Sequence, residues 1–147
     1  GARVKLGSRS LERAQQAAAA IQSQVDGSEV QGIATATGEE TLLAAKDAEV
    51  IIAAGAAGIQ LISKSVWEQC EQLKVLIDLN AVPPLGIEGV DVMDKAKADG
   101  QQILYGAIGV GGTKMKIHKA AIASLFESNE QVLDAEEIYS IGESLES

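Results

Sequence analysis

The chain has 147 residues, of which 46% are apolar and 22% are charged, and this composition argues against disorder and favours one domain with a sizeable core. Its formal net charge of -9 argues against a general nucleic-acid binder, which needs a basic face. The single cysteine excludes an internal disulfide, and no apolar run is long enough to span a membrane.

The predicted elements alternate between strands and helices along the chain. Apolar strand patterns occur at residues 2–6, 29–35, 49–54, 73–79 and 103–107. Helical patterns lie between and after them, at residues 10–25, 37–46, 63–71, 113–126 and from 134 onward. Ser10 is a suitable N-cap for the first helix, and the sequence Thr-Gly-Glu-Glu at 37–40 has capping-box spacing.

This alternation, with strands apolar enough to be covered on both faces, predicts an α/β fold with a doubly wound, mostly parallel sheet of the Rossmann type. Such a fold normally starts with a strand, the loop G-x-G-x-x-G and a helix, and residues 1–147 contain no such unit. We therefore expect the chain to begin at the second strand. The missing first strand belongs at the centre of the sheet, so its absence is expected to expose two unpaired strand edges.

The corner after the first predicted strand is rich in donors for an anion. In a fold that prefers NAD, the second strand ends in an acidic residue that binds the ribose 2'-hydroxyl. Here the strand leads into Ser8, Arg9 and Ser10, and Arg13 follows one helical turn later. Guanidinium groups, hydroxyls and a helix N-terminus all favour phosphate. The corner therefore predicts a site for the 2'-phosphate of NADP, with a solvent-facing arginine beside a helix cap as the plainer alternative.

Two later loops have features of a ligand site. The run of small residues after the strand at 49–54 includes Ala54, Gly55 and Ala56, and it leaves room for a flat ligand against the backbone or simply makes a tight turn. Asn80 follows the next strand, in the loop that contains both prolines of the chain. Its side chain could form a hydrogen bond to a ribose or a carboxamide, or it could simply be a turn residue.

Other chemistry-bearing residues have simpler interpretations. Lys114 and Lys116 follow a glycine-rich stretch and are candidates for a substrate cleft or for solvated side chains. Trp67, Phe126 and His118 are expected to be structural, and Cys70 to be half-buried in a helix. No nucleophile with its base, carboxylate pair or metal cluster is recognisable in the sequence, which suits hydride transfer by a cofactor.

Several stretches together resemble the NADP-binding domain of bacterial methylene-tetrahydromethanopterin dehydrogenase, over nearly the whole chain. They are GSRSLERAQQAA, AAGAAGIQLI, DLNAVPPLGIEGVD, GAIGVGGTKMKIHKAAIASLFES and DAEEIY. The resemblance implies an oligomeric enzyme that oxidises a methylene group on a tetrahydropterin carrier of one-carbon units to methenyl and passes hydride to NADP. A cytoplasmic location is expected separately, because the sequence has no membrane-spanning run and its first residues lack the pattern of a secretory signal. It implies that residues 1–147 are part of the NADP-binding domain, without the N-terminal catalytic domain and the first βα unit.

The resemblance also assigns cofactor-binding positions. Ser8, Arg9, Ser10 and Arg13 would surround the 2'-phosphate, and Ala54, Gly55 and Ala56 would line the dinucleotide. Asn80, Ala81 and Gly109 would lie toward its nicotinamide end, while Lys114 and Lys116 would face the substrate cleft. Two alternatives stay open: a reductase similar to shikimate dehydrogenase, which also has a basic turn after its second strand, and a nucleotide-binding module without catalysis.

Overall fold

The computed structural model of the chain describes residues 1–128 and 130–146, and its architecture is α/β, as the sequence predicts. The strands form two sheets. One contains the parallel pair β1 (Arg3–Ser8) and β2 (Glu29–Ala34). The other has the order β3-β4-β6-β5, with β3 (Val50–Ala53), β4 (Val75–Asp78), β6 (Gln102–Tyr105) and β5 (Lys95–Asp99).

The second sheet is parallel except at one edge. β3, β4 and β6 run parallel to one another, while β5 pairs antiparallel with β6. The sequence analysis did not predict β5, because its residues Lys-Ala-Lys-Ala-Asp carry no large apolar side chain. Among the described residues, β1, β2, β3 and β5 each pair on one side only, and the expectation that a missing first strand belongs between two of these edges stays a prediction.

The helices occupy nearly all the predicted positions. They are α1 (Leu11–Gln24), α2 (Gly38–Ala45), α3 (Lys64–Trp67), α4 (Gly111–Leu125) and α5 (Ala135–Glu146). α3 is much shorter than the predicted helix over residues 63–71. None of the helices in the described residues is both long enough and apolar enough to cross a bilayer.

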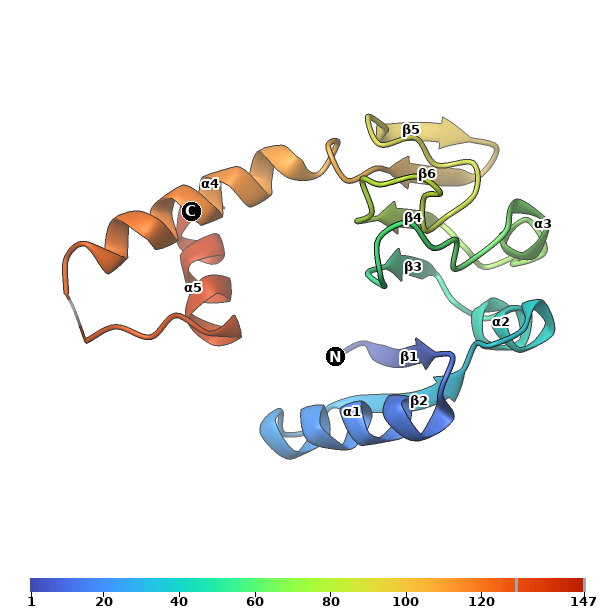
Figure 1. Cartoon of the computed structure of the whole chain (residues 1–147), viewed down its shortest axis with the longest axis horizontal. Coiled ribbons are helices and arrows are strands. Elements are labelled where there is room, and N and C mark those ends of the chain that lie inside the picture. Colours follow the sequence, from blue (N-terminus) through green and yellow to red (C-terminus); the bar gives the residue numbers. More distant parts are fainter. Residues whose placement is uncertain (129, 147) are drawn as a thin grey trace.

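The two sheets differ in direction. In Figure 1 the arrows of β1 and β2 point the opposite way from those of β3, β4 and β6. The carboxyl end of β1, which leads into the corner at Ser8, therefore lies on the other side of the view from the carboxyl ends of β3 and β4.

The main core lies on one face of the larger sheet. Leu76 and Leu104 are fully buried there, with Trp67 and Leu73 from the segment between β3 and β4. The opposite face is open: the exposed fractions of Val50 and Ile52 are 49% and 58%, and that of Ile103 is 41%. The prediction that the strand at 49–54 is covered on both faces is therefore wrong for the chain as it stands.

Three single-residue predictions can be checked against burial. Trp67 is 1% exposed and its Nε1 donates a hydrogen bond to the Glu88 carbonyl at 2.9 Å, which confirms its packing role. Phe126 is 87% exposed, so the prediction that it packs is wrong. Cys70 is fully buried, at 1% exposed, and it lies beyond the end of α3 at Trp67 rather than half-buried within a helix.

α4 and α5 form a separate pair. Their extensive contacts within the described residues are with each other, and Figure 1 shows both helices extending away from the larger sheet beyond the carboxyl end of β6. His118 is exposed on α4. The expectation that it is structural has no support from packing in the described part of the chain.

The predicted capping box at the start of α2 is confirmed. Thr37 Oγ1 accepts a hydrogen bond from the Glu40 N–H at 3.2 Å, and Glu40 Oε2 accepts one from the Thr37 N–H at 3.1 Å. These two bonds satisfy donors that have no partner within the helix.

Thr37→Ala is expected to lower the free energy of unfolding by about 1 kcal/mol, because it leaves the Glu40 N–H without its acceptor. Urea denaturation followed by circular dichroism measures this loss. Thr37→Ser keeps the hydroxyl and is expected to retain most of the stability. Equal losses in both variants would show that the hydroxyl does not stabilise α2.

Candidate functional site

The corner between β1 and α1 contains two local hydrogen bonds in which serine hydroxyls accept from backbone N–H groups. Ser8 Oγ accepts a hydrogen bond from the Ser10 N–H at 3.2 Å, and Ser10 Oγ accepts one from the Arg13 N–H at 3.4 Å, which confirms Ser10 as N-cap. Both hydroxyls thus act as acceptors toward the backbone, and each keeps its own O–H as a donor. The corner can therefore donate to an anion while its own backbone stays capped.

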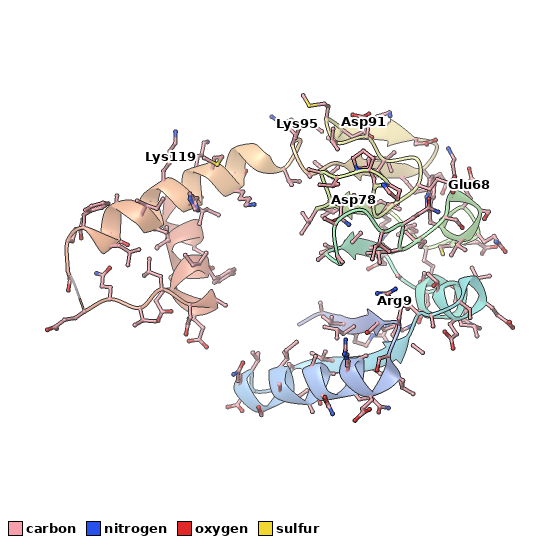
Figure 2. The ribbon with its side chains drawn as sticks, in the orientation of Figure 1. Arg9, Glu68, Asp78, Asp91, Lys95 and Lys119 are labelled. Carbon is pink, nitrogen blue, oxygen red and sulfur yellow. The ribbon has the colours of Figure 1, made fainter. Side chains whose placement is uncertain are left out.

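The two arginines of the corner carry charges that the chain does not neutralise. Arg9 and Arg13 are both exposed, and neither forms an ion pair with any carboxylate whose side chain the structure describes. Figure 2 shows Arg9 at the β1–α1 turn, on the side of that turn where β3 lies. The nearby Glu12 carboxylate instead accepts a hydrogen bond from Gln16 Nε2 at 3.2 Å. The positive charge at this corner is available to a ligand.

The loops that follow β3 and β4 are tied together. The Gly86 carbonyl oxygen accepts hydrogen bonds from the N–H groups of Leu61 at 2.8 Å and Ile62 at 3.1 Å. At the start of the loops, the Leu79 N–H donates to the Ala53 carbonyl at 3.0 Å. The predicted cofactor positions in these two loops therefore belong to one connected surface at the carboxyl ends of neighbouring parallel strands, which is where ligands bind in open α/β sheets.

Within these loops the predicted residues differ in exposure. Ala54, Gly55, Ala56 and Ala81 are exposed, whereas Asn80 is only 6% exposed. Asn80 Nδ2 is buried and has no hydrogen-bond partner in the described part of the chain. Because buried polar groups are nearly always satisfied in folded proteins, this amide is suited to an acceptor oxygen of a ligand.

Gly109 and the two candidate lysines lie after β6. The backbone at Gly109 is so close to the turn at residues 91–94 that a Cβ would meet the Asp94 carbonyl oxygen at 1.8 Å. This close approach is a structural reason for glycine there, beside the predicted cofactor role. Lys114 and Lys116 are exposed on α4, which carries them away from the larger sheet.

The structure thus brings together one part of the predicted site and leaves another part separate. The loops that contain Ala54 and Asn80 are joined, and the loop with Gly109 follows the neighbouring strand β6. The Ser8 corner belongs to the other sheet, whose strands point the opposite way in Figure 1. The proposed phosphate position and the loops after β3 and β4 are therefore not arranged around one common edge in residues 1–128 and 130–146.

Sequence reasoning missed two residues that shape the loop after β4. Asp78 is 1% exposed and accepts backbone hydrogen bonds from Asn80 at 2.9 Å and Ile87 at 2.8 Å. Gly86 packs so closely that a Cβ there would lie 2.8 Å from Asn80 Nδ2. A polar residue at the end of an apolar strand was the available signal for Asp78, because such a residue in a buried position has to be satisfied locally.

The described residues support neither a reactive thiol nor a metal site. Burial raises the pKa of the Cys70 thiol, which keeps this side chain protonated and unreactive. Among residues 1–128 and 130–146, no three His, Cys, Asp or Glu side chains are grouped so that they could hold a metal ion. Two surface hollows lie between α4 and α5 and between β1, β2 and α2, and none of the predicted site residues lines either of them.

The two separate groups of donors differ in their chemistry. Two serine hydroxyls and two guanidinium groups at the corner match a dianionic phosphate, and the buried Asn80 amide matches a neutral acceptor oxygen. The small residues after β3 leave the backbone accessible to a flat ligand.

Comparisons with known proteins find relatives of the chain. No protein-family model matches the sequence. Over 145 residues, or 99% of its length, the chain is 41% identical to a Methylorubrum extorquens protein named Bifunctional protein MdtA. Over 98 residues, or 65% of its length, it is 35% identical to the NAD(P)-dependent methylenetetrahydromethanopterin dehydrogenase of the same organism. The matches cover 50% and 33% of these relatives, so the chain spans about half of the first one's length. The chain is therefore related to a nicotinamide-dependent dehydrogenase.

Proposed function

We propose that this chain is the NADP-binding part of a dehydrogenase that oxidises methylene-tetrahydromethanopterin to the methenyl form. The observation that carries the cofactor assignment is the corner of Ser8, Arg9 and Ser10, which offers uncompensated positive charge and hydroxyl donors where an NAD-preferring fold has a carboxylate. The named activity of the 35% identical relative supports the substrate class.

In this proposal the residues of the chain bind and orient. The Ser8 and Ser10 hydroxyls and the guanidinium groups of Arg9 and Arg13 hold the 2'-phosphate, and the loop with Ala54, Gly55 and Ala56 lies along the dinucleotide. Asn80, Ala81 and Gly109 face its nicotinamide end. NADP, when bound, accepts the hydride that leaves the methylene carbon, so the protein needs no acid, base or nucleophile of its own for that transfer.

The rest of the proposal concerns the complete protein. A catalytic domain outside residues 1–147 would supply most of the pterin site, and Lys114 and Lys116 would face the cleft between the two parts. We place the enzyme in the cytoplasm as a homo-oligomer. The glycine-rich loop after the first strand of the NADP-binding domain would bind the pyrophosphate.

The test is turnover by the complete protein. With methylene-tetrahydromethanopterin and NADP, we expect reduced NADP to accumulate, measured by its ultraviolet absorbance, at a rate proportional to the enzyme concentration. Turnover with methylene-tetrahydrofolate alone would contradict the proposed substrate. NADP binding without turnover on either pterin would favour a nucleotide-binding module instead.

A further inference from the structure

The loop after β4 is closed by a buried carboxylate. Asp78 Oδ1 accepts the Asn80 N–H at 2.9 Å and Oδ2 accepts the Ile87 N–H at 2.8 Å, so one side chain binds the backbone at both ends of the loop. Asp78 is 1% exposed and forms no ion pair within the described residues. A buried aspartate without a cation is rare, and here the two N–H donors satisfy it.

Asp78 also lies next to the buried amide that lacks a partner. A Cβ at Gly86 would lie 2.9 Å from Asp78 Oδ1 and 2.8 Å from Asn80 Nδ2, so the glycine backbone packs against both side chains. A Cβ there would also be 3.0 Å from that of Ala53, at the end of β3. The Asn80 side chain is thus confined by Gly86, while its own backbone N–H is held by Asp78.

We propose that Asp78 is a positioning residue that acts through Asn80. By holding the Asn80 backbone, it directs the Nδ2 donor toward an acceptor oxygen in the nicotinamide half of the cofactor. This inference rests on the proposed function, because it takes NADP as the ligand. Because the Asn80 loop and the Ser8 corner belong to different sheets, the contribution of this amide is assigned to the half of the cofactor that lies away from the 2'-phosphate.

The test compares two ligands in the complete protein by calorimetric titration. NADP contains both halves, whereas 2',5'-ADP has the phosphorylated adenosine and lacks the nicotinamide half. We expect Asp78→Asn and Asn80→Ala each to raise the Kd of NADP by about three- to tenfold and to leave the Kd of 2',5'-ADP unchanged. The double variant should bind NADP no more weakly than Asn80→Ala alone, because Asp78 acts through that side chain.

Hydrogen exchange without ligand gives an independent readout. Asp78→Asn is expected to speed amide exchange at Asn80 and Ile87, whereas Asn80→Ala should leave the Ile87 amide protected. Cys70→Ala is the matched control: Cys70 is equally buried but lies five positions before the start of β4, so the substitution should lower stability without changing either Kd. If Asp78→Asn does not fold, Gly86→Ala provides a second variant: its Cβ would press on both Asp78 Oδ1 and Asn80 Nδ2, and it should raise the Kd of NADP without changing that of 2',5'-ADP.

The outcomes separate this inference from the proposed function. Unchanged NADP binding in Asp78→Asn, additive losses in the double variant, or equal weakening of NADP and 2',5'-ADP would each overturn the positioning role. Failure of the unsubstituted protein to bind 2',5'-ADP would instead refute the phosphate corner and, with it, the proposed cofactor.

Discussion

Replacing Arg9 by alanine in the complete protein is expected to raise the Kd of NADP by about ten- to hundredfold and the Kd of NAD by less than about threefold. The expectation follows from the location of the guanidinium group, which is exposed, has no carboxylate partner in the described residues and stands beside two serine hydroxyls. A charge-assisted hydrogen bond contributes roughly 1.5 to 3 kcal/mol, and only NADP carries the 2'-phosphate that receives it.

Arg3→Ala provides the control for the change in net charge. Arg3 is also exposed, but it lies at the opposite end of β1, so its removal should change NADP and NAD binding equally and weakly. Calorimetric titration of each variant with NADP and with NAD gives the factor by which each Kd rises over that of the unsubstituted protein. An equal loss of NADP and NAD affinity in Arg9→Ala would remove the phosphate assignment. Because the corner faces solvent, the preference of the unsubstituted protein for NADP over NAD should also decline at high salt.

Gly106→Ala is expected to be strongly destabilising. A Cβ at this position would lie 1.9 Å from the Asp91 carbonyl oxygen and 2.6 Å from the Val92 carbonyl carbon, and both are backbone atoms that cannot rotate away. The Gly106 N–H also donates to the Asp94 carbonyl at 2.8 Å, so the turn cannot separate from the strand without losing that bond. We expect the free energy of unfolding to fall by about 3 kcal/mol or more.

Gly112→Ala is the matched control in the same stretch of sequence. Apart from its chain neighbours and the backbone of its own helix, no atom of the described residues lies within 4 Å of a Cβ at Gly112, and the residue is in α4, where alanine is the better helix former. The substitution should raise the stability by up to about 1 kcal/mol. Urea denaturation is expected to show a lower free energy of unfolding for Gly106→Ala and a higher one for Gly112→Ala. An unchanged free energy of unfolding in Gly106→Ala would contradict the close approach of the turn to this residue.

Local signals in the sequence predicted most of the secondary structure. The capping box at Thr37 and the N-cap at Ser10 depend on residues three positions apart, so the sequence alone contains the whole interaction. β5 was missed because an edge strand with one partner needs no apolar pattern. The exposure of Ile52 and Phe126 could not be foreseen either, since periodicity indicates which side chains share a face and not what covers that face.

For the candidate site, the sequence identified residue types suited to a ligand, and their role in binding stays a prediction. Donor-rich corners and small-residue loops can be recognised from residue type, which is why Arg9 and Asn80 were singled out from the sequence. The role of Asp78 depends on two backbone N–H groups, one of them nine residues away, and no local pattern encodes that closure. The opposite directions of β1 and β3 in Figure 1 likewise follow from tertiary packing.

The oxygen of Gly86 has a consequence for redesigning this protein. Since a single acceptor atom serves Leu61 and Ile62, any alteration that moves one of the two loops changes the geometry available to the other. If only one of the two loops were replaced by that of a relative, the N–H groups of Leu61 and Ile62 would no longer be aligned with the Gly86 carbonyl oxygen. The two segments should be exchanged as a single cassette, from the end of β3 to Ile62 together with Leu79 to Ile87.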